Sequence, residues 1–422
     1  MESTKKQPVR VTYIWLSGKD AHHDIRSKDR TMYMTAEELK KNPKELNAES
    51  FFPIWNFDGS STGQAKGLNT EILLRPVNAY PCCLPRISSG KIPWILVLAE
   101  CYLPSGEPTA DNSRAVARDA FDELLDEHPW FGLEQEFFIV DRNGRPYGWP
   151  THGFPEPQGP FYCSSGAQFA WGRKYVDLHL EVCLEMGLNV SGTNGEVTPG
   201  QWEFQVGPCE GIEMGDQMTV ARWVLLRILE DADLDVDYRA KPIQGDWNGS
   251  GLHTNFSTES TRKENGLDAI YEYIDRLRKT VQKDIVFYGS ENNVRLTGKH
   301  ETSKATEFSS GVGTRGTSIR IPNSVAAERR GYMEDRRPAG DADPYLITSR
   351  LFASAVGLKG TALDIASPLH EKDWMSRGFE KSALIFFFFF KALLCNKNIE
   401  DKKKLKKNVA TKSKNNVRKI KQ

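Results

Sequence analysis

Carboxylates spaced two residues apart within apolar runs are the residues of this chain best suited to chemistry. Glu134 and Glu136 flank a single residue, and Glu203 lies between Trp202 and Phe204. In an extended strand, successive side chains point to opposite faces, so such carboxylates share one space while their apolar neighbours pack behind them. Carboxylates gathered in this way repel one another unless cations lie between them. These stretches therefore predict a cation site built on β-strands.

His253 adds an imidazole to this set, and it follows a glycine-rich approach from Asn248 to Gly251. Sites dominated by carboxylate oxygens with one imidazole suit Mg²⁺ or Mn²⁺ better than zinc. Two simpler interpretations remain, because a Glu-x-Glu pair can be a solvated strand face and a lone histidine can be a neutral core residue. The strand continues after Glu136 as Phe137-Phe-Ile-Val140, and this apolar character favours the cation site.

Length and charge limit the class of protein. The chain has 422 residues, more than one ordinary hydrophobic core usually organises, so we expect a small domain joined to a larger one. Lys+Arg and Asp+Glu both total 56, but residues 401–422 contain nine Lys, one Arg and one Asp. The rest of the chain is therefore mildly acidic, which argues against a broad nucleic-acid-binding face.

The cysteines and the N-terminus indicate the compartment. Seven cysteines are an odd number, they lack the paired spacing of a zinc site, and the N-terminus has no apolar signal core. These features predict a reducing, cytoplasmic setting. The longest apolar run, Ala383 to Phe390, is well short of the ~20 residues that a transmembrane helix needs, so no membrane association is expected.

The order of strand and helix patterns predicts an α+β fold. Short strands and turns fill residues 1–110, expected to form a small β-grasp-like N-terminal domain. In residues 111–382, strands alternate with helices, which predicts a larger domain with a curved antiparallel sheet backed by helices. Asn112 or Ser113 would cap its first helix. The expected strands include 131–140, 202–206 and 251–256, and the expected helices are 115–125, 174–186, 214–231 and 266–288.

Residues 383–422 form an atypical tail. Five consecutive phenylalanines, Phe386 to Phe390, precede a segment rich in Lys and Asn with almost no apolar periodicity. We interpret this tail as a disordered extension or as translated A/T-rich non-coding DNA. A basic tail that binds anionic partners is the alternative.

Three longer stretches complete the pattern: Trp55-Asn-Phe-Asp-Gly-Ser-Ser-Thr62, Lys241 through Ser257, and Arg315-Gly-Thr-Ser-Ile-Arg-Ile-Pro322. With these and Glu134-Gln-Glu136, the chain closely resembles the glutamine synthetase family, in the shorter form found mainly in eukaryotes. The resemblance extends from about Val11 to about Ser349, in order and with few gaps. It implies ATP-dependent ligation of ammonia to the γ-carboxylate of L-glutamate through γ-glutamyl phosphate. The products would be L-glutamine, ADP and phosphate, in nitrogen assimilation and ammonia detoxification.

The resemblance also assigns ligands to two or more ions, Mg²⁺ or Mn²⁺, in each active site. One ion would be held by Glu136, Glu196 and Glu203. The second, between the nucleotide phosphates and the acceptor, would be held by Glu134, His253 and Glu334.

ATP would be held through metals and arginines, because the sequence contains no GxxxxGK[ST] loop. By the resemblance, three arginines would contact phosphate or the transferring phosphoryl group: Arg315, Arg320 and Arg336. Three further residues would flank the adenosine: Trp130, Ser257 and Tyr332. The simpler interpretations are surface ion pairs for the arginines and a core position for Trp130.

For glutamate, the resemblance implies that Arg295 grips the α-carboxylate, with further hydrogen bonds from Asn248 and Gly249. Glu301 lies on a stretch rich in Gly, Ser and Thr that ends near Gly316. Such a composition is typical of a mobile loop, and here it predicts a lid whose carboxylate closes the site.

Asp58 is the outlier, because it lies in the N-terminal region. Asp-Gly by itself is an ordinary turn. By the resemblance, Asp58 reaches the active site of a neighbouring subunit and there binds and deprotonates ammonium, with Ser61 and Tyr162 nearby. A shared site requires a homo-oligomer, and this branch of the family implies a decamer of two pentameric rings.

Two other functions remain open. Related ligases join glutamate to other amines, and these would be expected to replace the ammonium group around Asp58. Other relatives have lost metal ligands and become structural proteins. Every ligand position is filled in this sequence.

Overall fold

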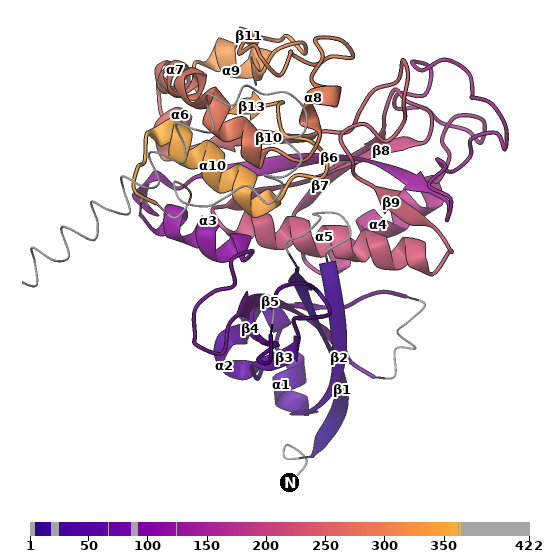
Figure 1. The fold of residues 1–422 in the computed structure, drawn as a ribbon, viewed down its shortest axis with the longest axis vertical. Coiled ribbons are helices and arrows are strands. Elements are labelled where there is room, and N and C mark those ends of the chain that lie inside the picture. Colours follow the sequence, from indigo (N-terminus) through magenta and orange to yellow (C-terminus); the bar gives the residue numbers. More distant parts are fainter. Residues whose placement is uncertain are drawn as a thin grey trace, which may run out of the picture. The chain divides into compact units, whose positions relative to one another are not determined.

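The computed structural model describes residues 5–17, 25–65, 67–85, 92–123, 125–361 and 363. All of them belong to one compact unit that spans residues 1–369. Within this unit the strands form a smaller sheet from the N-terminal residues and a larger sheet from the remainder (Figure 1). The tail expected at residues 383–422 lies outside the described residues, and the domain boundary near residue 110 stays a prediction.

The smaller sheet has five strands in the order β2-β1-β5-β4-β3. Their bounds are Lys6–Leu16 (β1), Ile25–Thr35 (β2), Trp55–Asp58 (β3), Glu71–Pro81 (β4) and Trp94–Tyr102 (β5). β1 and β5 run parallel, and the other neighbours are antiparallel. Alternate residues of β1, such as Val9, Val11 and Tyr13, are buried together, so this sheet has its own core. Three short helices follow β2: Ala36–Lys40 (α1), Pro43–Glu45 (η1) and Ala48–Phe51 (α2).

The larger sheet has eight strands, of which seven follow the order β11-β12-β13-β10-β6-β8-β7 while β9 pairs with β6. Their bounds are Trp130–Val140 (β6), Val190–Gly195 (β7), Gln201–Glu210 (β8), Asp235–Asp237 (β9), Leu252–Ser257 (β10), Ser310–Val312 (β11), Ile319–Ile321 (β12) and Met333–Asp335 (β13). The paired strands are antiparallel except β11 and β12. The expected curved antiparallel sheet is therefore confirmed apart from one parallel pair at its edge.

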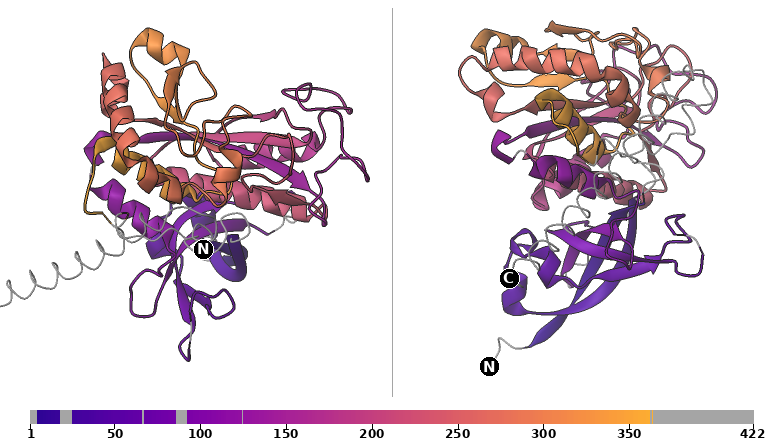
Figure 2. Two further views of the ribbon diagram at one scale, coloured as in Figure 1. Left: turned by 45° about the horizontal axis from the view of Figure 1, so that its top comes forward. Right: turned by 60° about the vertical axis from the view of Figure 1, so that its left-hand side comes forward.

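Helices back this sheet, as the sequence predicts (Figures 1 and 2). Their bounds are Ser113–Asp122 (α3), Leu125–Glu127 (η2), Arg173–Glu185 (α4), Glu213–Glu230 (α5), Glu259–Arg262 (α6), Gly266–Asp284 (α7), Ile285–Phe287 (η3), Asn292–Arg295 (α8), Asn323–Glu328 (α9) and Pro344–Val356 (α10). The four predicted helices are confirmed within a few residues, and the Asn112 side chain accepts from Ala115 N as the expected cap. Among the described residues, no helix is both long and apolar enough to span a bilayer.

Strand β6 has one face for the helices and one for chemistry. Leu133 and Phe137 are fully buried, and between them Gln135 accepts a hydrogen bond from Arg222 of α5 (2.8 Å). Glu134 and Glu136 point to the opposite face, because side chains alternate along a strand. The packing of β6 against α5 thus presents both carboxylates to the same space.

A buried ion-pair network connects the smaller sheet to the helices. Arg114 of α3 binds Glu100 of β5 (2.5 Å) and Asp216 of α5 (2.8 and 3.0 Å). The hydroxyl of Tyr345 in α10 donates to Asp216 (2.7 Å). The side chains of Glu100 and Asp216 are 1% and 3% exposed, so these charges depend on one another for solvation.

We expect Asp216→Ala to destabilise the protein by about 3–5 kcal/mol, because it leaves Arg114 without its second carboxylate partner in a buried position. Chemical or thermal unfolding measures this loss. The matched control is Asp233→Ala, since the Arg142–Asp233 pair is 76% exposed on both sides and should contribute less than about 1 kcal/mol. If both variants lost the same free energy of unfolding, the buried Arg114–Asp216 ion pair would contribute no more to stability than an exposed pair.

Candidate functional site

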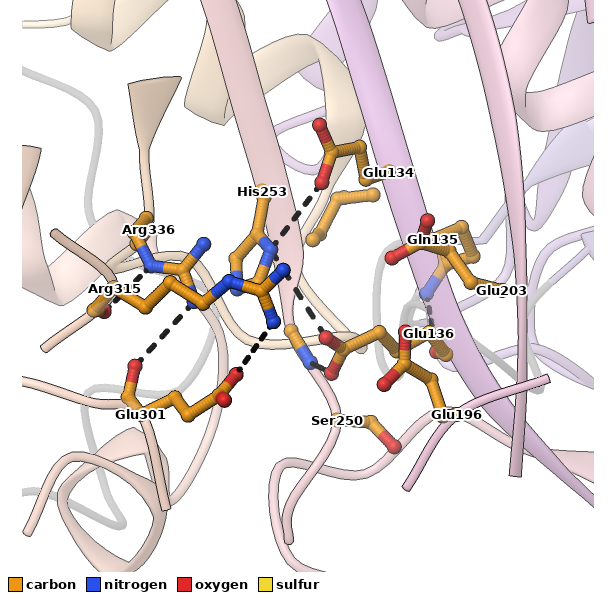
Figure 3. Close-up of polar contacts among 12 residues, drawn as sticks. Glu134, Gln135, Glu136, Glu196, Glu203, Ser250, His253, Glu301, Arg315 and Arg336 are labelled. Atoms are coloured by element: carbon orange, nitrogen blue, oxygen red, sulfur yellow. Dashed lines mark hydrogen bonds and ion pairs between the residues drawn. The ribbon is translucent and has the colours of Figure 1, made fainter. Parts of the chain in front are cut away.

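The register of four strands gathers the predicted carboxylates on one face of the larger sheet. His253 of β10 lies opposite Glu134 of β6, and Glu136 lies opposite Glu203 of β8. Glu334 of β13 comes two strands from Glu134, through Asn255 of β10. Figure 3 shows Glu134, Glu136, Glu203 and His253 converging from these strands, with Glu196 beside Glu136.

His253 stands at the centre of this cluster. Its Nδ1 lies 3.5 Å from Glu134 Oε2, 3.7 Å from Glu334 Oε1 and 4.0 Å from Glu136 Oε1. Two groups of three ligands have their ligand atoms within 4.8 Å of one another: Glu134, His253 and Glu334, and Glu136, Glu203 and His253. The two candidate cation positions therefore share the imidazole.

The first of these groups contains the same residues that the sequence suggests for the second ion. In the other group, His253 stands where the sequence suggests Glu196. Glu196 follows β7, and Figure 3 shows its side chain next to that of Glu136. The structure thus brings all six predicted ligands together, while their assignment to particular ions stays a prediction.

The protonation of the cluster indicates what it is built to hold. Burial raises the pKa of Glu196 to about 8, and repulsion from Glu136 adds to this shift. Burial, together with the charges of Glu134 and Glu136, also raises the pKa of Glu203 well above its usual value. Burial and then Arg336 lower the pKa of His253 to about 3, so the imidazole is uncharged, the form that binds a cation. Oxygens with one imidazole fit Mg²⁺ or Mn²⁺.

Neutral hydrogen-bond donors orient the carboxylates. Sequence patterns did not predict this role. Three of the donors, Asn194, Gln205 and Asn255, nevertheless lie two residues from Glu196, Glu203 and His253 in the sequence. The donors and their acceptors are Asn255 to Glu134 (2.8 Å), Gly251 N to Glu136 (2.6 Å), Gln205 to Glu203 (2.7 Å) and Asn194 to Glu196 (3.1 Å). Such outer partners fix the direction of each ligand oxygen.

Arg295 of α8 is buried beside the cluster, where the sequence predicts the grip on the α-carboxylate of glutamate. It donates to His253 Nε2 (3.1 Å) and to the carbonyl of Arg336 (3.2 Å). Gly251 makes this approach possible, because a Cβ there would lie 2.3 Å from Arg295 Nη2. Gly249 is confined in a similar way, since its Cβ would lie 2.2 Å from the Ala240 carbonyl. The glycines therefore let the backbone pass close to the site.

Two of the predicted phosphate-binding arginines contact a metal-ligand candidate. Arg336 donates to Glu334 Oε1 (2.6 Å), and Arg320 lies 3.2 Å from the other carboxylate oxygen of Glu334. Arg336 also donates to the carbonyls of Arg315 (2.9 Å) and Glu301 (3.4 Å). These contacts place the guanidinium groups of Arg336 and Arg320 beside the carboxylate cluster.

The predicted lid residue Glu301 pairs with Arg315 at 3.4 Å. Their side chains are 47% and 51% exposed, so this ion pair is weak and easily opened. Both His300 and Glu301 have positive φ, at 53° and 60°, which is uncommon for residues other than glycine. Tyr162 interacts with Arg315 as well, and burial raises the pKa of its hydroxyl.

The predicted adenosine residues lie at one end of the paired strands β6 and β10. Trp130 is opposite Ser257. Burial raises the pKa of the Tyr332 hydroxyl, and the nearby charges of Glu134 and Glu334 add to this shift. Arg262 also lies here, although no pattern in the sequence predicts a role for it. Its guanidinium carbon lies 4.1 Å from the centre of the Trp130 ring, and it donates to Ser257 Oγ (2.9 Å).

Asp58 is not brought to the cluster within this chain. It ends β3 in the smaller sheet, where Ser60 N and Oγ donate to it (3.0 and 2.8 Å) and Ser61 Oγ lies at 3.5 Å. The Ser60 hydrogen bonds lower the pKa of the Asp58 carboxyl. Its role in a neighbouring subunit stays a prediction.

Comparison with known proteins gives a consistent result. The family described as "Glutamine synthetase, catalytic domain" matches residues 110–373. A "Probable glutamine synthetase" of Caenorhabditis elegans is 48% identical over 352 residues, which is 82% of this chain and 91% of that protein. The "Glutamine synthetase" of Panulirus argus is 48% identical over 349 residues, covering 82% and 92%. That of Saccharomyces cerevisiae is 44% identical over 357 residues, covering 85% and 92%.

These matches cover most of both chains, and the matching segment contains the strands that carry the cluster of carboxylates and His253. The chain belongs to the eukaryotic branch of the glutamine synthetase family, the glutamate–ammonia ligases.

Proposed function

We propose that this protein makes L-glutamine from L-glutamate, ammonia and ATP through γ-glutamyl phosphate, and that it serves nitrogen assimilation and ammonia detoxification. One observation carries the proposal: two overlapping acidic groups share His253 and face Arg315, Arg320 and Arg336. Anionic side chains hold cations, and cationic side chains bind phosphate, so this arrangement suits phosphoryl transfer.

Each arginine of the site would have its own role in the reaction. Arg295 would bind the α-carboxylate of glutamate, and Arg336 with Arg320 would neutralise the charge of the phosphoryl group during its transfer. A γ-carboxylate is a poor electrophile because its charge repels a nucleophile, and phosphorylation gives it a good leaving group. Glu301 and Arg315 then close over the acyl phosphate and limit attack by water.

Divalent ions, Mg²⁺ or Mn²⁺, would supply charge neutralisation for the phosphates when bound. The ligands that would hold them are Glu134, Glu136, Glu196, Glu203, His253 and Glu334. Trp130, Ser257 and Tyr332 would flank the adenosine of ATP, the co-substrate. The Arg262 guanidinium lies over the ring of Trp130 and would help to hold that ring in place for adenine.

Ammonium would be bound and deprotonated by Asp58 of an adjacent subunit, together with Ser61. The exposure of Asp58 and its contacts with Ser60 and Ser61 in the smaller sheet support this proposal, because the carboxylate is open to a second copy. The protein would then be a homo-oligomer, a decamer of two pentameric rings. Cytoplasmic location is proposed from the sequence, and the six described cysteines are free thiols.

Release of phosphate from ATP tests this function. We expect release that requires glutamate, ammonium and Mg²⁺ or Mn²⁺ together, with glutamine formed in equal amount. Methylamine in place of ammonium should support much less phosphate release. The reason is that this chain retains Asp58, the residue proposed to bind ammonium, which ligases for other amines would be expected to replace. Equal rates with methylamine would point to an amine ligase of another specificity. No release with any amine would point to a structural role.

A further inference from the structure

Gln158 links two parts of the candidate site through its side-chain amide. Its Oε1 accepts hydrogen bonds from the backbone N of Asn248 (2.9 Å) and from Thr198 Oγ1 (3.0 Å), and its Nε2 donates to Asn248 Oδ1 (2.8 Å). Thr198 belongs to the turn between β7 and β8, which also contains Glu196. The amide therefore joins this turn to the loop that carries Asn248 and Gly249.

The orientation of both amides follows from this pattern. A backbone N–H can only donate, so the Gln158 atom that faces Asn248 N must be the oxygen. Nε2 must then face the Asn248 side chain, and only Oδ1 of Asn248 can accept from it. The Asn248 Nδ2 is thereby left as a donor that points elsewhere. Within the described ranges, no residue accepts a hydrogen bond from it.

The surroundings hold this arrangement in place. Gly159 N donates to the carbonyl of Val197 (3.0 Å), and Gln201 Nε2 donates to the carbonyl of Gly249 (2.9 Å). The loop continues to Gly251, whose N–H binds Glu136 (2.6 Å). A Cβ on Gly249 would lie 3.1 Å from Arg295 Cγ. The loop of Asn248 thus runs between Gln158 on one side and Arg295 and the cluster on the other.

We propose that Gln158 is a positioning residue that fixes Asn248 as a hydrogen-bond donor towards the substrate. A donor binds an anionic oxygen, so Asn248 would hold the α-carboxylate of glutamate beside Arg295, and would reject the ammonium group. This inference rests on the proposed function, and it adds the residue that sets the polarity of substrate recognition.

Gln158→Glu reverses that polarity. Both oxygens of a glutamate at this position accept hydrogen bonds, so Asn248 must turn its amide to donate Nδ2 to residue 158. Its Oδ1 then faces the substrate carboxylate. We expect the KM for glutamate to rise about tenfold or more, as for the loss of a hydrogen bond to a charged group. The KM for ATP should stay within about twofold of wild type, because the nucleotide residues are untouched.

A second ligand separates positioning from general damage. In the α-carboxamide of glutamate, an NH₂ group replaces one carboxylate oxygen, and this NH₂ can donate to a turned Asn248. The wild-type protein should strongly prefer glutamate to the carboxamide, and Gln158→Glu should narrow this preference about tenfold. A merely structural defect would weaken both ligands alike. Calorimetric titration of each ligand, with metal and ADP present, measures the preference without depending on turnover.

Gln168→Glu is the matched control, because Gln168 is exposed on the same segment and the substitution makes the same change in charge. It should leave both KM values and the preference unchanged. A thermal melt establishes that each variant is folded. Should Gln158→Glu not fold, Gln158→Met removes the same three hydrogen bonds at similar volume and should narrow the preference as well.

The outcomes are distinct. A wild-type preference that narrows in the Gln158 variant and not in Gln168→Glu supports the proposal. An unchanged preference in a folded Gln158 variant overturns it while leaving glutamine synthesis intact. Wild-type protein that makes no glutamine, yet binds glutamate with the expected preference, contradicts the proposed function and not the role of Gln158.

Discussion

Glu203→Gln should abolish glutamine formation and at the same time make the metal-free protein more stable. Glu203 lies among Glu134, Glu136 and Glu196, and its burial, followed by repulsion from these carboxylates, raises its pKa well above the ordinary value. An amide of the same shape removes one charge from this repulsion. The same change removes a ligand, so kcat should fall about a thousandfold or more, since several kcal/mol of transition-state stabilisation are lost.

Stability should depend on pH in a defined direction. The pKa of Glu196 is raised to about 8, so the folded state holds this proton more tightly than the unfolded chain, whose pKa is about 4.3. The stability that this proton contributes is fully present below the pKa of Glu196 in the unfolded chain. It is lost as the pH rises through the pKa of Glu196 in the folded state. The melting temperature of metal-free protein should therefore fall between about pH 5 and pH 8. Mn²⁺ or Mg²⁺ should remove this fall by satisfying the charges.

Thermal melts with and without metal test both effects. Metal should raise the melting temperature of the wild-type protein strongly and that of Glu203→Gln little. Glu272→Gln is the control, because Glu272 is exposed on α7 and pairs only loosely with Arg276 (3.4 Å). If Glu203→Gln kept the full metal response, the cluster would not be the metal site.

Two inactive variants should restore activity to each other when they assemble together. Asp58→Asn should lack ammonium activation, and Glu203→Gln should lack a metal ligand. If each site takes Asp58 from one subunit and Glu203 from its neighbour, random mixing leaves about a quarter of the sites with both wild-type residues. Co-expressed variants should therefore recover about a quarter of wild-type activity.

The control pair for this experiment is Glu203→Gln with His253→Ala. Both residues lie on the same face of the larger sheet, so no mixed site regains both, and activity should stay absent. Co-expression with two different affinity tags isolates the mixed oligomers, and light scattering gives their mass. Absence of recovery with Asp58→Asn would show that Asp58 is not shared across subunits. Recovery in the control pair would show that Glu203 and His253 do not serve the same site of one chain.

Local patterns predicted the secondary structure well where periodicity was strong. The helix expected at 214–231 is Glu213–Glu230, and the strand expected at 131–140 is Trp130–Val140. The helix expected at 266–288 ends earlier, at Asp284, and the chain continues as the separate turn Ile285–Phe287. That end depends on packing, since Asp284 is buried and binds Arg350 of α10 (2.8 Å). A sequence window does not contain this long-range contact.

The sequence by itself determined the residue types of the site and the face each occupies, because alternation along a strand is a local property. Once the stretch around Glu134 and Glu136 is a strand, these two carboxylates share a face in any fold. Tertiary structure decided the rest. Strand register brought His253 opposite Glu134, within reach of both acidic groups, and folding brought Gln158 to Asn248 across some ninety positions of chain. Distances between separate segments depend on register, turns and burial of the whole core, and no local pattern encodes them.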